Sequence, residues 1–138
     1  MQSHQQKNAL LASKRSSRTQ PVLLFAEDEA STRELLLFIT KDIPIKEAII
    51  VKDGYRAVEK HFTNAPDITF LDINMPVMDG LRALHIIKTL DPKAYVVMLS
   101  SNSQATNVLK ARSSGVSDFI VKPFTKQKVL SCLDKLSS

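Results

Sequence analysis

The sequence predicts a single α/β domain in which a parallel β-sheet is covered by helices on both faces. From Pro21 onward, short apolar runs alternate with stretches of helical periodicity, which is typical of repeated β-α units. The length of 138 residues is close to the commonest size for a domain with one core. The expected strands are 21–26, 47–51, 67–71, 94–99 and 117–121, and the expected helices are 31–41, 54–63, 79–90, 104–113 and 125–136.

Local signals support the helix boundaries. Short polar side chains at a helix start can accept hydrogen bonds from the free backbone N–H groups of the first turn. Gly115 fits the left-handed residue that ends the fourth helix. The residues expected to cap or open helices, in chain order, are Ser31 or Thr32, Asp53-Gly54, Asp79-Gly80 and Thr125.

The net charge of +5 is concentrated at the N-terminus. Residues 1–20 contain four basic residues and no acidic one, so residues 21–138 are nearly neutral. A basic segment with few apolar residues usually cannot bury enough surface to fold. We therefore expect residues 1–20 to be a flexible tail, with phosphate pairing to nucleic acid or an anionic membrane as the weaker alternative.

The remaining composition excludes several classes of protein. Cys132 is the only cysteine, so no disulfide can form within the chain, and its spacing places it in the core of the last helix. His4, His61 and His85 are widely separated, which argues against a histidine metal site. No apolar run approaches the roughly 20 residues of a membrane span, and Ala9–Ala12 is too short for a signal-peptide core. The expected compartment is the cytoplasm.

Polar side chains stand at the ends of four predicted strands. Asp72 ends the third strand, Glu27 and Asp28 follow the first, Ser100 follows the fourth, and Lys122 follows the fifth. The carboxyl ends of parallel strands lie at one edge of the sheet, so these groups are expected to converge on one site. The alternative is an acidic rim with an incidental lysine.

These residues resemble the receiver domain of two-component response regulators. The resemblance covers residues 21–136 and rests on order, spacing and strand position. It implies a flavodoxin-like fold with strand order 2-1-3-4-5, in which a phosphoryl group passes from a partner's phosphohistidine to Asp72 in a Mg²⁺-dependent reaction. The motifs that carry it are Glu27-Asp28, the segment Leu71–Gly80 around Asp72, Ser100 and Lys122-Pro123-Phe124.

A cation is expected among the three carboxylates. Each pair would repel by about 4 kcal/mol at about 4 Å and an effective dielectric constant of about 20. Oxygen ligands and a phosphoryl substrate favour Mg²⁺. By the resemblance, Asp28 and Asp72 bind the ion directly, the backbone carbonyl of Asn74 adds a third oxygen, and Glu27 acts through water.

The resemblance also assigns roles after phosphorylation. Lys122 screens the phosphoryl oxygens, and a cis Lys122-Pro123 peptide is expected to aim it inward. Ser100, in preference to Ser101, donates its hydroxyl to the attached group. Phe119 is the aromatic residue expected to rotate inward, with plain core packing as the alternative.

The expected partners are a sensor histidine kinase or phosphotransfer protein and a downstream protein that binds residues 104–136. A dimer that depends on phosphorylation is left open. By the resemblance, Asn74 and Asn102 hold the positions that tune phosphoryl lifetime in receivers. The chain ends at Ser138 with no DNA-binding domain, so a stand-alone receiver that is not an enzyme is expected. The alternatives are a receiver cut from a longer regulator or hybrid kinase, a pseudo-receiver, and a haloacid-dehalogenase-type phosphatase. That last class needs an acid where Asn74 stands.

Overall fold

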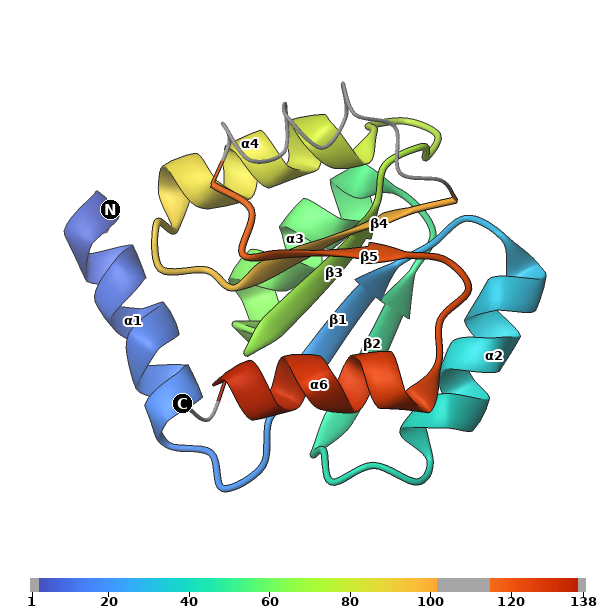
Figure 1. The fold of residues 1–138 in the computed structure, drawn as a ribbon. Helices are drawn as coiled ribbons and strands as arrows, with labels where there is room; N and C mark the ends of the chain where they lie inside the picture. The colour runs from blue at the N-terminus through green and yellow to red at the C-terminus, as the bar shows by residue number, and fades with distance from the viewer. Residues whose placement is uncertain (1–2, 102–114, 137–138) are drawn as a thin grey trace.

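The computed structural model describes residues 3–101 and 115–136. Its centre is a parallel sheet of five strands in the order β2-β1-β3-β4-β5 (Figure 1). This order confirms the predicted flavodoxin-like fold. The strands are β1 (Val22–Ala26), β2 (Glu47–Val51), β3 (Ile68–Asp72), β4 (Val96–Ser100) and β5 (Asp118–Val121).

Helices cover both faces of the sheet. On one face lie α2 (Ala30–Thr40) and α6 (Lys126–Leu136), and on the other lie α3 (Gly54–Asn64) and α4 (Gly80–Leu90) (Figure 1). The helix predicted over 104–113 falls outside the described residues.

Three of the predicted helix starts are confirmed. The side chains of Asp53, Asp79 and Thr125 each accept a hydrogen bond from a backbone N–H three residues later, at 2.7, 2.9 and 3.1 Å. Gly115 has the predicted left-handed backbone, with φ of 86°. The helix that it was expected to end is not among the described residues.

The predicted cap of the first domain helix is wrong. Helix α2 begins at Ala30, so Ser31 and Thr32 lie inside its first turn, and Glu29 at the cap position makes no side-chain capping bond. The guanidinium of Arg33 instead donates hydrogen bonds to the carbonyls of the residues just before the helix. An arginine from inside the helix therefore holds this end.

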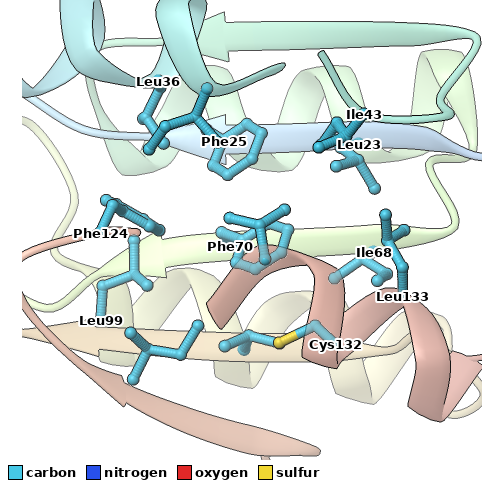
Figure 2. Close-up of a cluster of buried hydrophobic side chains, with 14 residues drawn as sticks. Leu23, Phe25, Leu36, Ile43, Ile68, Phe70, Leu99, Phe124, Cys132 and Leu133 are labelled. Atoms are coloured by element: carbon cyan, nitrogen blue, oxygen red, sulfur yellow. The ribbon is translucent and has the colours of Figure 1, made fainter. Parts of the chain in front are cut away.

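The core between the sheet and helices α2 and α6 is built around three aromatic rings (Figure 2). Phe25 on β1 and Phe70 on β3 stack with centroids 4.5 Å apart and planes 9° apart. Phe124 meets both rings edge-on, at 5.8 and 6.3 Å. Cys132 is buried in the same cluster, in agreement with its predicted core position. Packing of Phe124 fixes the backbone two residues after Lys122.

The opposite face has a second core, in which small and branched side chains of α3 and α4 pack on the sheet. Strands β1 and β3 are therefore covered on both sides, and every residue in them is buried. This two-sided burial explains why both strands are almost wholly apolar rather than alternating, with Thr69 as the one polar residue inside them. The first charged residues occur at their carboxyl ends.

The prediction that residues 1–20 form a flexible tail is wrong for most of the segment. Residues His4–Ser16 form helix α1, which begins with a reciprocal capping box between Ser3 and Gln6. The helix lies beside the amino ends of the strands (Figure 1). Composition predicted disorder because the segment offers little apolar surface, but Arg15 and Arg18 anchor it through hydrogen bonds to the domain.

Within residues 3–101 and 115–136, no helix has the length and apolarity needed to cross a bilayer.

Candidate functional site

Three carboxylates meet at the carboxyl end of the sheet, as predicted. Strand β1 ends at Ala26, directly before Glu27 and Asp28, and its neighbour β3 ends at Asp72. One oxygen from each of the three carboxylates lies within 4.8 Å of the other two. Glu27 is fully buried and Asp72 is 6% exposed, whereas Asp28 is exposed to solvent. The site thus has two inner carboxylates and one at its mouth.

Lys122 reaches two of these carboxylates. Its Nζ lies 2.5 Å from Glu27 Oε1 and 2.9 Å from Asp72 Oδ2. The backbone N–H of Lys122 donates to the carbonyl of Ser100 at 2.7 Å, which fixes the chain beyond β5 against the end of β4. The Lys122-Pro123 peptide is cis, in agreement with the resemblance. The side chain passes the end of β4 to reach the ends of β3 and β1.

Burial and neighbouring charges shift the pKa values of Glu27 and Lys122. Burial raises the pKa of Glu27 to about 7, and the neighbouring Asp72 adds to this, while the hydrogen bond from Lys122 opposes it. Burial alone would lower the pKa of Lys122, yet its hydrogen bonds to Glu27 and Asp72 raise it above its usual value. Lys122 is therefore an ammonium at neutral pH.

The cluster suits a hard divalent cation. Two carboxylates 4.8 Å apart repel by roughly 3–4 kcal/mol at an effective dielectric constant of about 20. One ammonium among three carboxylates leaves excess negative charge when all are ionised. Every side-chain ligand atom is a carboxylate oxygen, the donor type that Mg²⁺ prefers.

Arg33 is a supporting residue that the sequence reasoning missed. Its Nη1 donates to the carbonyl of Glu27 at 3.2 Å and to that of Asp28 at 2.7 Å. The backbone N–H of Glu29 donates to Glu27 Oε2 at 3.2 Å. Together these bonds fix the turn that carries two of the three acids. The sequence signal that could have predicted this role is the position of Arg33, one turn into the helix that follows the acidic pair Glu27-Asp28.

Gly80 is a second residue that the sequence reasoning treated only as a helix start. A Cβ atom at this position would lie 2.0 Å from the carbonyl oxygen of Asp72. The N–H of Gly80 donates to the carbonyl of Ile73 at 2.8 Å, so α4 begins directly against the end of β3. Asn74, in the loop between them, is exposed two residues past Asp72.

The residues with predicted switching roles lie on β4 and β5. Ser100 is the last residue of β4 and is 5% exposed, whereas Ser101 is exposed. Phe119 pairs in register with Met98 and is half-buried against the core formed with α3 and α4. Asn102 and the helix predicted over 104–113, which begins the 104–136 surface, lie outside the described residues.

Comparison with known proteins agrees with this geometry. A family model for the response regulator receiver domain matches residues 23–134. The chemotaxis protein CheY of Listeria monocytogenes is 42% identical over 113 residues, which are 82% of this chain and 95% of that protein. The response regulator domain of Thermotoga maritima CheB has a TM-score of 0.72 at 31% identity, covering 86% of this chain and 94% of that one.

A chain of the CheX–CheY–BeF3–Mg²⁺ complex from Borrelia burgdorferi is about as similar to this protein as the CheB domain is. Its TM-score is 0.71 at 32% identity, and the match covers 85% of this chain and 89% of that chain. The protein therefore belongs to the response regulator receiver family. This is a family of signalling domains rather than of typical enzymes.

Proposed function

We propose that this receiver accepts a phosphoryl group on Asp72 from the phosphohistidine of a sensor kinase or phosphotransfer protein, and that it signals through a protein contact. The observation that carries this proposal is the placement of the Asp72 carboxylate 2.9 Å from the Lys122 ammonium and beside Glu27 and Asp28. A nucleophile, a fixed positive charge and a set of oxygen ligands are the parts that phosphoryl transfer requires.

The chemistry uses this chain's own side chains. A carboxylate oxygen of Asp72 attacks the phosphorus, an O–P bond forms, and the P–N bond to the donor histidine breaks. Lys122 neutralises charge on the phosphoryl oxygens, and the hydroxyl of Ser100 donates to the attached group.

The residues that would hold Mg²⁺ are Asp28 and Asp72 directly, Asn74 through its backbone carbonyl, and Glu27 through water. When bound, the ion supplies positive charge that stabilises the phosphoryl oxygens. The support is the oxygen-only cluster and its unbalanced charge. The related Borrelia complex, which contains BeF3 and Mg²⁺, supports a metal-dependent reaction.

The output is proposed to be a change in the surface that includes β5 and α6, spanning residues 104–136. Ser100 turns toward the phosphoryl group, and Phe119 follows into the space beside β4. Phe119 is half-buried, so its ring still has contact area to gain on moving inward. The presence of CheX in the Borrelia complex supports a protein as the downstream partner.

Labelling with a small phosphodonor tests the acceptor. Acetyl phosphate with Mg²⁺ should add one phosphoryl group to the wild-type chain, detected by mass spectrometry, while chelation should abolish the gain. Asp72→Asn should not be labelled, whereas the matched control Asp42→Asn, at an exposed position, should be labelled like wild type. Labelling that persists in Asp72→Asn would falsify the assignment. No labelling of wild type would indicate a pseudo-receiver, and rapid turnover of a phosphate ester would indicate a phosphatase.

The switch is tested separately. Ser100→Ala keeps the nucleophile and should still accept phosphate, but it should lose most of the phosphorylation-dependent amide-exchange changes across residues 104–136. If Ser100→Ala shows the same differences as wild type, Ser100 is not the trigger.

A further inference from the structure

Helix α1 lies outside the part of the chain that matches the receiver family, which is residues 23–134. It packs at the amino ends of the strands, whereas Asp72 lies at their carboxyl ends (Figure 1). Its attachment therefore involves groups that the phosphoacceptor site does not use.

Two arginines, one in the last turn of α1 and one two residues beyond its end, make most of the polar contacts that attach it. Arg18 donates from Nη1 to the carbonyl of Ala65 at 2.5 Å and to Asp67 Oδ2 at 3.0 Å, and from Nη2 to the carbonyl of Asn64. Arg15 donates from Nε to the carbonyl of Pro66 at 2.9 Å and from Nη2 to Asp91 Oδ2 at 2.7 Å. The two guanidinium groups thus donate hydrogen bonds to three consecutive backbone carbonyls and two carboxylates.

Bonds within the domain hold one of these carboxylates and the carbonyls in place. The left-handed backbone of Ala65, with φ of 48°, ends α3 and turns the chain through the three carbonyls. Asp67 Oδ2 also accepts the backbone N–H of Val22 at 2.8 Å. Both features belong to the domain, so this half of the arrangement does not require α1.

The second carboxylate is held by a buried histidine. Asp91 can only accept, so His61 Nε2 carries the proton that it donates to Asp91 Oδ2, at 2.8 Å. His61 Nδ1 then accepts from the hydroxyl of Thr69 at 2.9 Å. Burial alone would raise the pKa of Asp91, yet hydrogen bonds from His61 and Arg15 lower it to about 2. Asp91 is therefore a fixed, charged acceptor, with its side chain 4% exposed.

The rest of α1 has few contacts with the domain. Lys14 Nζ donates to the carbonyl of Thr63 at 2.9 Å, and among residues His4–Ser16, all of which the structure describes, Leu11 alone is buried. A cavity of about 490 Å³ lies between one side of the helix, from His4 to Lys14, and the domain residues Phe62 and Leu90. Burial of one leucine contributes roughly 1.5–3 kcal/mol, so the arginine contacts are needed to keep the helix docked.

We propose that residues 64–67 and Asp91 form a receptor for two guanidinium groups three residues apart at the end of a helix. Helix α1 is its ligand, and this helix can detach from the domain while the core stays folded. We name this surface the arginine-pair receptor. Its chemistry selects arginine over lysine, because each side chain donates from two different nitrogens, whereas the single ammonium of lysine cannot reproduce that fork.

The full chain carrying both Arg15→Lys and Arg18→Lys tests the proposal at constant charge. Amide exchange across residues 4–16 should become at least about tenfold faster, since several charge-assisted hydrogen bonds are lost. Exchange in α3 and β3 should remain protected. The matched control replaces Arg56 and Arg82 with lysine, because both are exposed and lie outside the receptor, and it should exchange like wild type.

A synthetic peptide of residues 3–20 then probes the emptied receptor in trans. It should bind the double-lysine variant and not the wild-type chain, in which α1 blocks the surface. The same peptide with lysine at both arginine positions should bind at least about tenfold more weakly. Unchanged protection of α1 in the variant, or loss of protection in α1 and the core together, would overturn the proposal. So would equal binding of the two peptides.

Discussion

Replacing Gly80 with alanine should displace Asp72, the proposed phosphoacceptor, through backbone contacts alone. The added Cβ would stand 2.0 Å from the carbonyl oxygen and 2.8 Å from the carbonyl carbon of Asp72. The next contact, at 3.0 Å, is with the Cα of Ile73. All three atoms belong to the backbone of the acceptor strand and its first loop residue, so no side chain can rotate away to make room.

The size of the effect follows from these distances. Cβ atoms essentially never approach other heavy atoms closer than 3.0 Å, so the start of α4 and the end of β3 must separate by at least about 1 Å. Overpacking of this kind costs roughly 1–3 kcal/mol of unfolding free energy. A misplacement of about 1 Å in a reacting group can also slow a reaction by roughly a hundredfold. Gly80→Ala is therefore expected to lose both stability and phosphorylation rate.

Gly54→Ala is the matched control, because its Cβ would meet the carbonyl oxygen of Met78 at 2.1 Å. The clash is of similar size but lies six residues from the acceptor. Urea unfolding should show comparable destabilisation of the two variants, while labelling by acetyl phosphate should slow much more in Gly80→Ala. The reasoning fails if Gly80→Ala keeps the wild-type stability and labelling rate, or if both variants slow labelling equally.

Three further predictions follow from single side chains. Val77 is 82% exposed and has φ of 68°, a backbone conformation that strains a β-branched residue. Val77→Gly should therefore raise the unfolding free energy, measured by urea denaturation, by up to about 1 kcal/mol. A lower unfolding free energy in the variant would contradict this. Burial lowers the pKa of His61 below 6.5, so as the pH falls this histidine is protonated in the unfolded chain before it is protonated in the folded one. The unfolding free energy should therefore fall as the pH drops below 6.5, by at most about 1.4 kcal/mol per pH unit. Chemical unfolding of wild type and His61→Asn between pH 7.5 and pH 5 checks this, and equal slopes would refute it. Lys122→Met leaves Glu27 and Asp72 without their shared cation and should cost about 1–3 kcal/mol, part of which Mg²⁺ should restore; an unchanged melting temperature with and without Mg²⁺ would count against this.

The sequence was sufficient to predict the parallel sheet and the edge that carries the candidate site, because both follow from burial. Strands β1 and β3 are covered on two sides, so all but Thr69 of their interior residues are apolar, and the first charged residues mark their carboxyl ends. Glu27, Asp28 and Asp72 are such residues, and parallel topology alone brings them to one edge. The alternation of strands and helices and one general rule of connection were sufficient for this part, whereas the strand order was implied only by the resemblance to receiver domains.

Helix α1 could not be predicted in the same way, because long-range polar contacts fix it. Composition measures how much apolar surface a segment can bury, and by that measure the segment is too polar to fold. The contacts of Arg15 and Arg18 join residues 46 to 76 positions apart. The position of Arg33, one turn into the helix after an acidic pair, was a usable signal, but its partners are backbone carbonyls, which the sequence does not identify.

Strand β3 joins the two polar ends of the domain. Asp67 precedes it and binds Arg18 in the arginine-pair receptor, and Asp72 ends it in the proposed phosphoacceptor site. The strand is fully buried and is paired with β1 on one side and β4 on the other, so a shift at one end would have to break ladder bonds to reach the other.

Departure of α1 breaks none of those bonds, because its arginines contact only side chains and carbonyls before β3 and after α4. The chain with lysine at positions 15 and 18 should therefore accept phosphate at Asp72 at the wild-type rate, measured as acetyl phosphate labelling, even though α1 is released. A labelling rate that falls together with α1 protection would show that β3 transmits displacement between the two ends, and the two sites would then form one regulated unit.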